Sequence, residues 1–590
     1  MKKKINLISV FCAILLFSAC QDVFKLPTDG RLSYENIFSD NALTSGYLNK
    51  CYAYIPLAGM NYDSNNFLAV YSDEAQDAED VQNGRSANYY SGMSTSSSNL
   101  VESGSNGSTY NTMYTGIRKC NVFIDNIDNA KNLVVATDRN KWKGEAYTLR
   151  AYYFWYLVKR MGPLPIIKHE LPLDFDYSTH IRPTFYACVK SIIEDCDSAL
   201  NQPNFPWRTT LENDRGSMNK SVAMAIKSQA ILFAASPLWN GGSNYWTEAA
   251  AITKVALDSL LTKNYALHNP KAASPTVKAY SDYQRFFLLK PEMLDNPAND
   301  KETIYSQKGQ LGAVWQQHGL PNVLDVTKAG ACPSQELVDA YETLNGMPVL
   351  NPAQPYLDAD HLQPNYNTAN IQYNKLRPYE NRDPRLFSTI YCNGVNLNLA
   401  TNTLPVWTYV GGTAGISKTD RKYTRTGYYL RKFADYSSTK TANKDGYWRY
   451  FRLAELYLNY AEAEFYANGV TANAVNALNQ TRLRAGLPAL TTSISAPEFE
   501  QRLRNERRIE FAFEEHRYFD VRRWKVQADN EAIITGMNIK PVSPGVYSFE
   551  RIVVSRRNVT DPKYLIWPIP YAEQLKYKQA GVEYQNPGWN

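Results

Sequence analysis

The chain has 590 residues and a mass of 67.0 kDa, so it is long enough for one large core or for several sub-domains that share one. Apolar residues make up 44%, charged residues make up 20% and the mean hydropathy is −0.45, which together exclude a disordered chain and a membrane-spanning one. The net charge of +6 is small for this length and gives no reason to expect nucleic acid as a partner.

The first residues have the three-part form of a secretory signal: Lys2 to Lys4, an apolar run over residues 5–17, and the small pair Ser18-Ala19. The apolar run is shorter than the roughly 20 residues needed to span a bilayer. Because Cys20 follows the small pair, the segment resembles a bacterial lipoprotein signal, although Phe17 stands where Leu is usual. We expect residues 1–19 to be removed and Cys20 to be acylated. The alternative is an ordinary cleaved signal with an incidental cysteine.

Cysteine and histidine are too scattered to predict a disulfide framework or a metal site. No CxxC pair and no HxxxH or HExxH spacing occurs. We therefore expect no metal and mostly buried free thiols, with the pairing of Cys188 and Cys196 left open. Besides Cys12 and Cys20, the cysteines are Cys51, Cys120, Cys188, Cys196, Cys332 and Cys392.

Apolar and aromatic residues recur at helical steps of three and four in the first half and the last third of the chain. The longest run, residues 139–161, ends at Gly162-Pro163. Further helices are predicted at residues 223–233, 246–262, 453–463 and 472–484. A helix, a short turn and a second helix with Ala and Tyr at the crossing positions resemble degenerate tetratricopeptide pairs.

Two other kinds of segment separate or follow the helical blocks. Residues 83–109 are rich in Ser, Gly and Asn and predict a long polar loop. Residues from about 290 to 446 contain Pro and Gly throughout and predict an irregular, loop-rich sub-domain with short strands. We expect a mainly α fold with a helical scaffold at about 35–290 and 447–525, and an extended C-terminal segment at about 526–590.

Catalytic motifs are missing: there is no GxxxxGK[ST], GxGxxG or GxSxG sequence. The acidic run Asp73 to Asp80 lacks the order of a calcium loop, so we expect a solvated acidic face there, and calcium has no positive support. Glu514-Glu515 beside Asp520 could suggest a glycosidase pair, but spacing alone cannot set the separation that this chemistry needs. We predict no catalytic residues, no cofactor and no enzyme activity.

The segment from Asn505 to Trp524 is the densest mixture of charged and aromatic residues in the chain. Glu506 and Glu510 share a helix face, and Arg517 and Arg522 can hold carboxylates in a forked geometry. Glu and Arg nearly balance here, which argues against nucleic-acid binding and predicts an internal network of ion pairs.

With those segments identified, the chain resembles the SusD/RagB family, surface lipoproteins of Bacteroidetes that work with TonB-dependent outer-membrane transporters. The resemblance rests on the lipoprotein signal and on segments that follow in the family's order: residues 144–167, 221–240, 381–386, 450–463 with 481–487, 506–524, 566–570 and 585–589. It implies a helical fold with four tetratricopeptide-like pairs, no catalysis, and a lid over a SusC-like transporter that imports the captured nutrient.

The matching segments are helix faces, ion pairs and turns, so they transfer no binding residue. Candidates come instead from aromatic and amide side chains outside the periodic helices, because sugar rings stack on Trp and Tyr while amides bind hydroxyl groups. They are Asn88, Tyr89, Tyr90 and Asn99 in the polar loop, Trp246 after Gly241-Gly242, and Trp315.

Three functions remain open at this point. The first is a lipid-anchored, surface-exposed protein that binds an oligosaccharide or polysaccharide for a TonB-dependent transporter. The second keeps the same role but carries peptides or protein fragments. The third is a tetratricopeptide-type interaction protein without a small ligand.

Overall fold

The structure of the chain is a computed structural model. The structure describes residues 32–56, 66–79, 84–102, 107–130, 135–172, 174–176, 179, 182–268, 282–287, 297–309, 321, 328–398, 403–433 and 446–589. Cys20 and Trp315 lie outside these residues. Within them, no helix has both the length and the apolar character needed to cross a bilayer.

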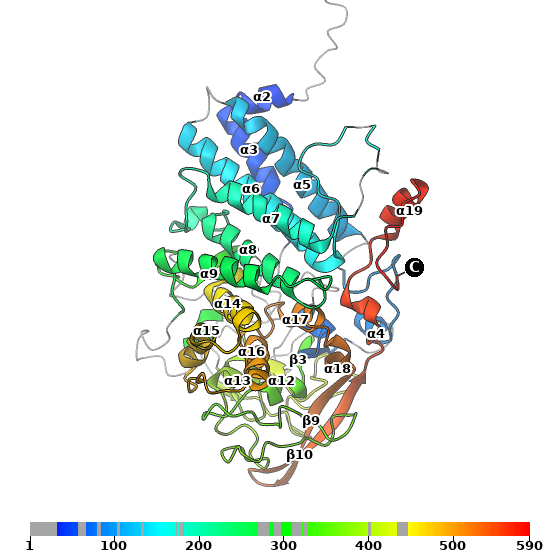
Figure 1. Cartoon of the computed structure of the whole chain (residues 1–590). Coiled ribbons are helices and arrows are strands. Elements are labelled where there is room, and N and C mark those ends of the chain that lie inside the picture. Colours follow the sequence, from blue (N-terminus) through cyan, green and yellow to red (C-terminus); the bar gives the residue numbers. More distant parts are fainter. Residues whose placement is uncertain are drawn as a thin grey trace, which may run out of the picture.

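Helices dominate the described structure, as the sequence predicts (Figure 1). The long helices are α3 (Asn41–Tyr52), α5 (Ser108–Asn126), α6 (Ala136–Met161), α7 (Phe185–Leu200), α8 (Lys220–Ala235), α9 (Trp246–Thr262), α14 (Leu453–Asn468), α15 (Ala472–Arg484) and α16 (Ala496–Glu510). The shorter ones are α2 (Tyr34–Phe38), α4 (Arg85–Tyr90), α10 (Asp282–Phe287), α12 (Gln335–Ala340), α13 (Pro384–Thr389), α17 (Arg517–Arg523), α18 (Gln527–Glu531) and α19 (Tyr571–Gln579).

Local sequence signals set the ends of these helices. Side-chain oxygens of Thr184, Asn219 and Thr471 accept hydrogen bonds from backbone N–H groups in the first turns of α7, α8 and α15. Helix α6 ends at Gly162, whose φ of 76° is accessible to glycine at little cost, and a Cβ added there would lie 3.2 Å from the Trp239 ring. The predicted bounds of α9 and α15 are confirmed.

Within the described residues the long helices stack as four pairs: α3 with α5, α6 with α7, α8 with α9, and α14 with α15. Helix α9 packs directly along α14, although residues 263–452 separate them in the chain (Figure 1). The loop-rich segment is therefore an insertion into one continuous helical array. These four pairs and the short strands of the insertion confirm the predicted fold class.

The strands are short and pair two by two. Antiparallel pairs join β1 (Ala75–Asp77) to β3 (Ala331–Pro333), β2 (Thr303–Gly309) to β8 (Gly446–Arg452), β4 (Ile390–Tyr391) to β7 (Tyr429–Leu430) and β5 (Asn396–Asn398) to β6 (Thr403–Pro405). The longest pair is the hairpin of β9 (Ile533–Ser543) and β10 (Val546–Arg556). Pro544-Gly545 forms its turn, with Gly545 at a φ of 75°. The sequence analysis expected extended backbone here but not this pairing.

A buried network of ion pairs fastens the insertion to the helices, as the segment 505–524 predicts. Arg385, fully buried in the insertion, contacts Asp383 at 2.8 Å, Glu506 at 2.6 Å and Glu510 at 3.0 Å. Arg452 contacts Glu510 at 2.6 Å and Glu514 at 2.7 Å. Burial alone would raise the pKa of Glu510, but the guanidinium groups around it outweigh burial and lower that pKa well below its ordinary value.

Replacing Arg385 with methionine should therefore destabilise the fold strongly. Three buried carboxylates would lose the cation that they share. Removing one partner of a buried ion pair lowers the free energy of unfolding by about 3–5 kcal/mol, because the other charge stays buried without compensation. The matched control is Arg377→Met, because Arg377 is 68% exposed and pairs with the exposed Glu380, where a loss of about 0–1 kcal/mol is expected. Urea unfolding of both variants measures the difference, and equal midpoints would contradict the structural role of the network.

Candidate ligand-binding groove

A groove of about 540 Å³ lies where the insertion meets helices α16, α17 and α18. This volume is within the range of about 300–1,000 Å³ that is usual for ligand sites. Polar side chains from both walls reach it, including Arg504, Asn505, Tyr356 and Asp358.

Helix α16 forms the first wall. Gln501, Arg504, Asn505 and Arg508 line the groove and are spaced at steps of three and four, so they share one helix face. The other face holds buried Phe499 and Leu503 together with the carboxylates of the ion-pair network. This amphipathic pattern fixes which polar side chains point at the groove. Arg504 lies with its guanidinium 5.0 Å from the ring of Trp524.

The facing wall is the loop from Pro348 to His361, which contributes three prolines, Leu350 and Tyr356. The ring of Tyr356 stacks on His361 with 4.0 Å between centroids and 15° between planes. The Tyr356 hydroxyl donates to Asp339 at 3.1 Å, and an isolated bridge between Tyr356 and Pro364 closes the loop on itself. Prolines and these contacts restrict the conformational freedom of the loop backbone in this wall.

The floor carries charges held in place by buried partners. Arg517 donates two hydrogen bonds to Asp73, at 2.8 and 2.9 Å, and Arg508 contacts the same carboxylate at 2.7 Å. Burial would raise the pKa of Asp73, but Arg508 and Arg517 outweigh it and lower the pKa to about 2. The neighbouring Glu74 forms no ion pair with any residue that the structure describes: burial, and then the charge of Asp73, raise its pKa to about 8.

The groove thus presents hydrogen-bond donors on α16 and carboxylate acceptors on the facing loop and on α18. Guanidinium and amide groups of Arg504, Arg508 and Gln501 line it together with the carboxylates of Asp358 and Asp529. A sugar hydroxyl both donates and accepts hydrogen bonds, so a neutral polyhydroxylated molecule can satisfy both kinds of wall. The geometry therefore suits binding of hydroxyl-rich ligands.

The five predicted ligand residues that the structure describes do not line this groove. Tyr89, Tyr90 and Asn99 are 1%, 4% and 4% exposed, which corrects the expectation that they face a ligand. The Tyr89 hydroxyl accepts from Arg522 and the Tyr90 hydroxyl donates to the carbonyl of Val70.

The error came from the composition of residues 83–109, which is typical of a surface loop. Residues 85–90 form helix α4, and Asn558 donates a backbone hydrogen bond to the carbonyl of Tyr90, so the C-terminal segment holds the helix in the core. Asn88 and Trp246 are half-buried and stay candidates, and Trp315 lies outside the described residues.

The acidic run starting at Asp73 is not the solvated face that the sequence analysis expected. Asp73, Glu74 and Asp77 are all at most 3% exposed, and Asp77 accepts a hydrogen bond from Ser86 at 2.7 Å. Across the residues that the structure describes, no group of three or more His, Cys, Asp or Glu side chains is arranged to hold a metal ion. Asp73 instead balances the charges of Arg508 and Arg517.

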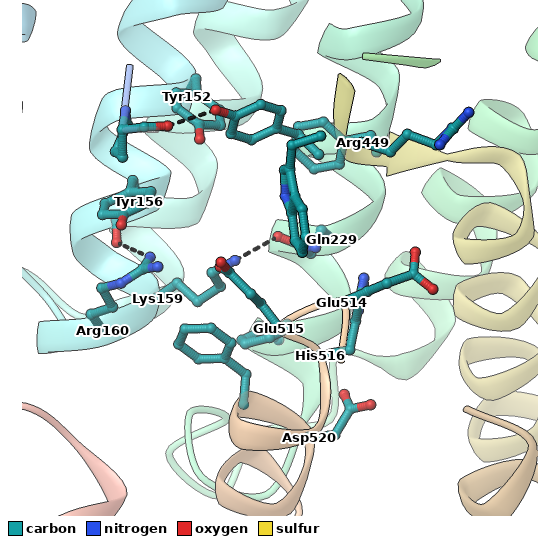
Figure 2. Close-up of a pocket in the computed structure, with 16 residues that line it drawn as sticks. Tyr152, Tyr156, Lys159, Arg160, Gln229, Arg449, Glu514, Glu515, His516 and Asp520 are labelled. Carbon is teal, nitrogen blue, oxygen red and sulfur yellow. Dashed lines mark hydrogen bonds between the residues drawn. The ribbon is translucent and has the colours of Figure 1, made fainter. Parts of the chain in front are cut away.

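The suggested carboxylate pair borders a different, enclosed cavity of about 60 Å³, shown in Figure 2. Lys159 reaches Gln229 there at 3.3 Å, and burial lowers its pKa to about 7. Glu514 and Asp520 lie on the side opposite Lys159 (Figure 2). Burial would raise the pKa of both carboxyls, but arginines outweigh it and lower both. A glycosidase acid needs a raised pKa, and this volume suits only water molecules.

The six described cysteines are buried free thiols, as predicted, and Cys188 and Cys196 do not pair. The groove residues Gln501, Arg504 and Tyr356 are not among the ligand candidates predicted from the sequence. Polar residues at positions 501, 504, 505 and 508, on the side of a helix away from Phe499 and Leu503, are the signal that could have found one wall. Nothing in the sequence indicates that residues 348–361 face them.

Comparisons with known proteins define the class. The model of the SusD family matches residues 292–589, and a second model, described as starch-binding and associating with the outer membrane, matches residues 41–204. A comparison with curated proteins finds no match. The chain belongs to the SusD family, because the first model covers more than half of it.

Solved structures share the fold. A SusD-like protein from Bacteroides fragilis superposes with a TM-score of 0.72 at 23% identity, over 94% of this chain and 98% of that one. A SusD-like carbohydrate-binding protein from the same species gives 0.67 at 20% identity, over 91% and 98%. A laminarin-binding SusD-like protein gives 0.57 at 18% identity, over 93% and 100%.

The raised pKa of Glu74 predicts a pH-dependent stability. The folded state keeps this carboxyl protonated up to about pH 8, whereas the unfolded state loses the proton near pH 4.5, so stability falls as pH rises between these values. Glu74→Gln should remove this loss and stabilise the protein at pH 8 by a few kcal/mol at most. Melting temperatures of both proteins at pH 5 and pH 8 test this, and parallel pH profiles would contradict it.

Proposed function

We propose that the protein is a surface-exposed lipoprotein of the outer membrane that binds an oligosaccharide or polysaccharide in the groove and passes it to a SusC-like TonB-dependent transporter. It acts by binding and release, without changing the bonds of its cargo. Acylation of Cys20 holds the helical body at the membrane.

The observation that carries the proposal is the groove itself, with donors on α16 and acceptors on the facing loop and floor, in a chain of the SusD family. The related carbohydrate-binding and laminarin-binding structures support a glycan as cargo. The family model described as associating with the outer membrane supports the location. Contacts of this kind suggest dissociation constants of roughly micromolar to millimolar, which suit capture followed by release.

Calorimetric titration of the mature protein against a panel of glycans and a panel of peptides tests the cargo. We expect at least one glycan to bind and Arg504→Ala to weaken that binding about tenfold, because a donor at the groove wall is lost. Arg118→Ala is the matched control, since Arg118 is an exposed arginine of α5 paired with Glu170. Binding of peptides but of no glycan would replace the cargo with peptides, and binding of neither would contradict the proposal.

Acylation gives a separate prediction. With Cys20→Ser, radiolabelled fatty acid should no longer be incorporated and the protein should leave the outer-membrane fraction. Cys12→Ser is the control, because Cys12 lies inside the expected signal and its loss should leave labelling unchanged. Labelling of the Cys20→Ser variant at the normal level would rule out this anchor. Co-purification of a transporter with the wild-type protein from membranes tests the partner.

A further inference from the structure

Four aromatic residues form a half-exposed strip on the helical side of the molecule, and we name it the aromatic track: Tyr186, Tyr245, Trp246 and Tyr466. Tyr186 stacks on Tyr245 with ring centroids 4.1 Å apart and planes 5° apart. Trp246 stacks on Tyr466 at 4.4 Å and 25°. All four side chains keep part of their surface in solvent. Two parallel ring pairs, joined through consecutive residues, therefore lie at the protein surface.

Different helices bring these rings together. Tyr186 lies in the first turn of α7, Tyr245 and Trp246 at the start of α9, and Tyr466 in the last turn of α14. The exposed turn 241–244 precedes the track, and the Asn244 side chain accepts a hydrogen bond from the backbone N–H of Trp246 at 3.1 Å. The first residues of α9 are thus set by a local turn, which fixes the direction of both ring pairs.

The neighbouring pair Phe185 and Trp239 shows what a purely structural stack looks like here. Its centroids are 4.1 Å apart, but Phe185 is only 5% exposed and the Trp239 ring packs over Gly162. In the aromatic track, by contrast, the tyrosine hydroxyl groups form hydrogen bonds with neighbouring glutamates. The Tyr186 hydroxyl donates to Glu248 at 2.7 Å and the Tyr466 hydroxyl donates to Glu500 at 2.7 Å. These bonds hold the rings in place at the surface without burying them.

The track leads to the groove. Arg504 donates to the Tyr466 hydroxyl at 3.0 Å, and Arg504 itself lines the groove beside Trp524. Helices α9, α14 and α16, which carry Trp246, Tyr466 and Arg504, pack in that order (Figure 1). Tyr466 therefore contacts both a residue of the groove wall, Arg504, and the next ring of the track, Trp246.

We propose that the aromatic track is an extension subsite for a neutral, extended polysaccharide chain, whose sugar rings lie against Trp246 and its neighbours while other units occupy the groove. Flat rings bind the apolar C–H faces of pyranose units and accept many sugar identities, whereas the groove supplies the hydrogen bonds that orient the chain. This inference rests on the proposed function and specifies its cargo as a polymer longer than the groove.

Chain-length dependence tests this subsite. The probes are amylose, laminarin and their oligosaccharides from disaccharide to octasaccharide, joined by the corresponding series of any other glycan that binds in the panel above. For the wild-type protein, affinity should rise with chain length by about tenfold or more beyond the length that fills the groove. Trp246→Ala should abolish this rise and leave the affinity for the shortest binding oligosaccharide within about twofold.

Three further variants separate loss of the aromatic track from a general effect of substitution. Trp246→Phe retains a flat ring and should recover most of the gain with length, and Tyr245→Ala should lose part of it. Tyr571→Ala removes a 46% exposed tyrosine of α19 outside the track and should match wild type. Melting temperatures confirm that each variant is folded. If glycans bind but the gain with length survives Trp246→Ala, the track is not a subsite although the proposed function stands; if no glycan binds, both fail.

Discussion

The described structure depends on buried arginines that are shared between distant parts of the chain. Arg385 of the insertion reaches Glu506 and Glu510 on α16, and Glu510 also meets Arg452 and Arg484. Desolvating so many charges is unfavourable unless each one meets an opposite charge with good geometry, so the arrangement tolerates few alternatives. The relative position of the insertion and the helical array, and with it the shape of the groove, follows from this requirement.

The same constraint explains why the polar groups of the groove are ordered. Asp73 is fixed by Arg508 and Arg517, and Arg504 is held between Trp524 and Tyr466. A ligand therefore meets side chains whose conformational freedom was already lost on folding, which reduces the entropy cost of binding. Weak individual contacts can then suffice for capture.

Much of the fold could be predicted because helical periodicity and capping are local signals, and α9 and α15 begin and end where the sequence places them. The near balance of Glu and Arg in residues 505–524 predicts that these charges pair internally, but not that Asp73, Arg385 and Arg452 supply partners. The site could not be predicted. Tyr89 and Tyr90 occur in a segment with the composition of a loop, yet contacts with residues hundreds of positions later bury them. The groove likewise needs residues 348–361 to face α16, and that pairing depends on tertiary packing that no local pattern encodes.

The adjacency of α9 and α14 has an evolutionary consequence. Since the inserted segment leaves and rejoins the array at neighbouring helices, its length and loops can change while the packing of α9 against α14 persists. Mutations there must preserve the arginine and carboxylate anchors and the buried core residues of the insertion, such as Tyr341, Leu386 and Tyr428. Such an arrangement allows the inserted loops to be exchanged as one unit on an unaltered helical frame.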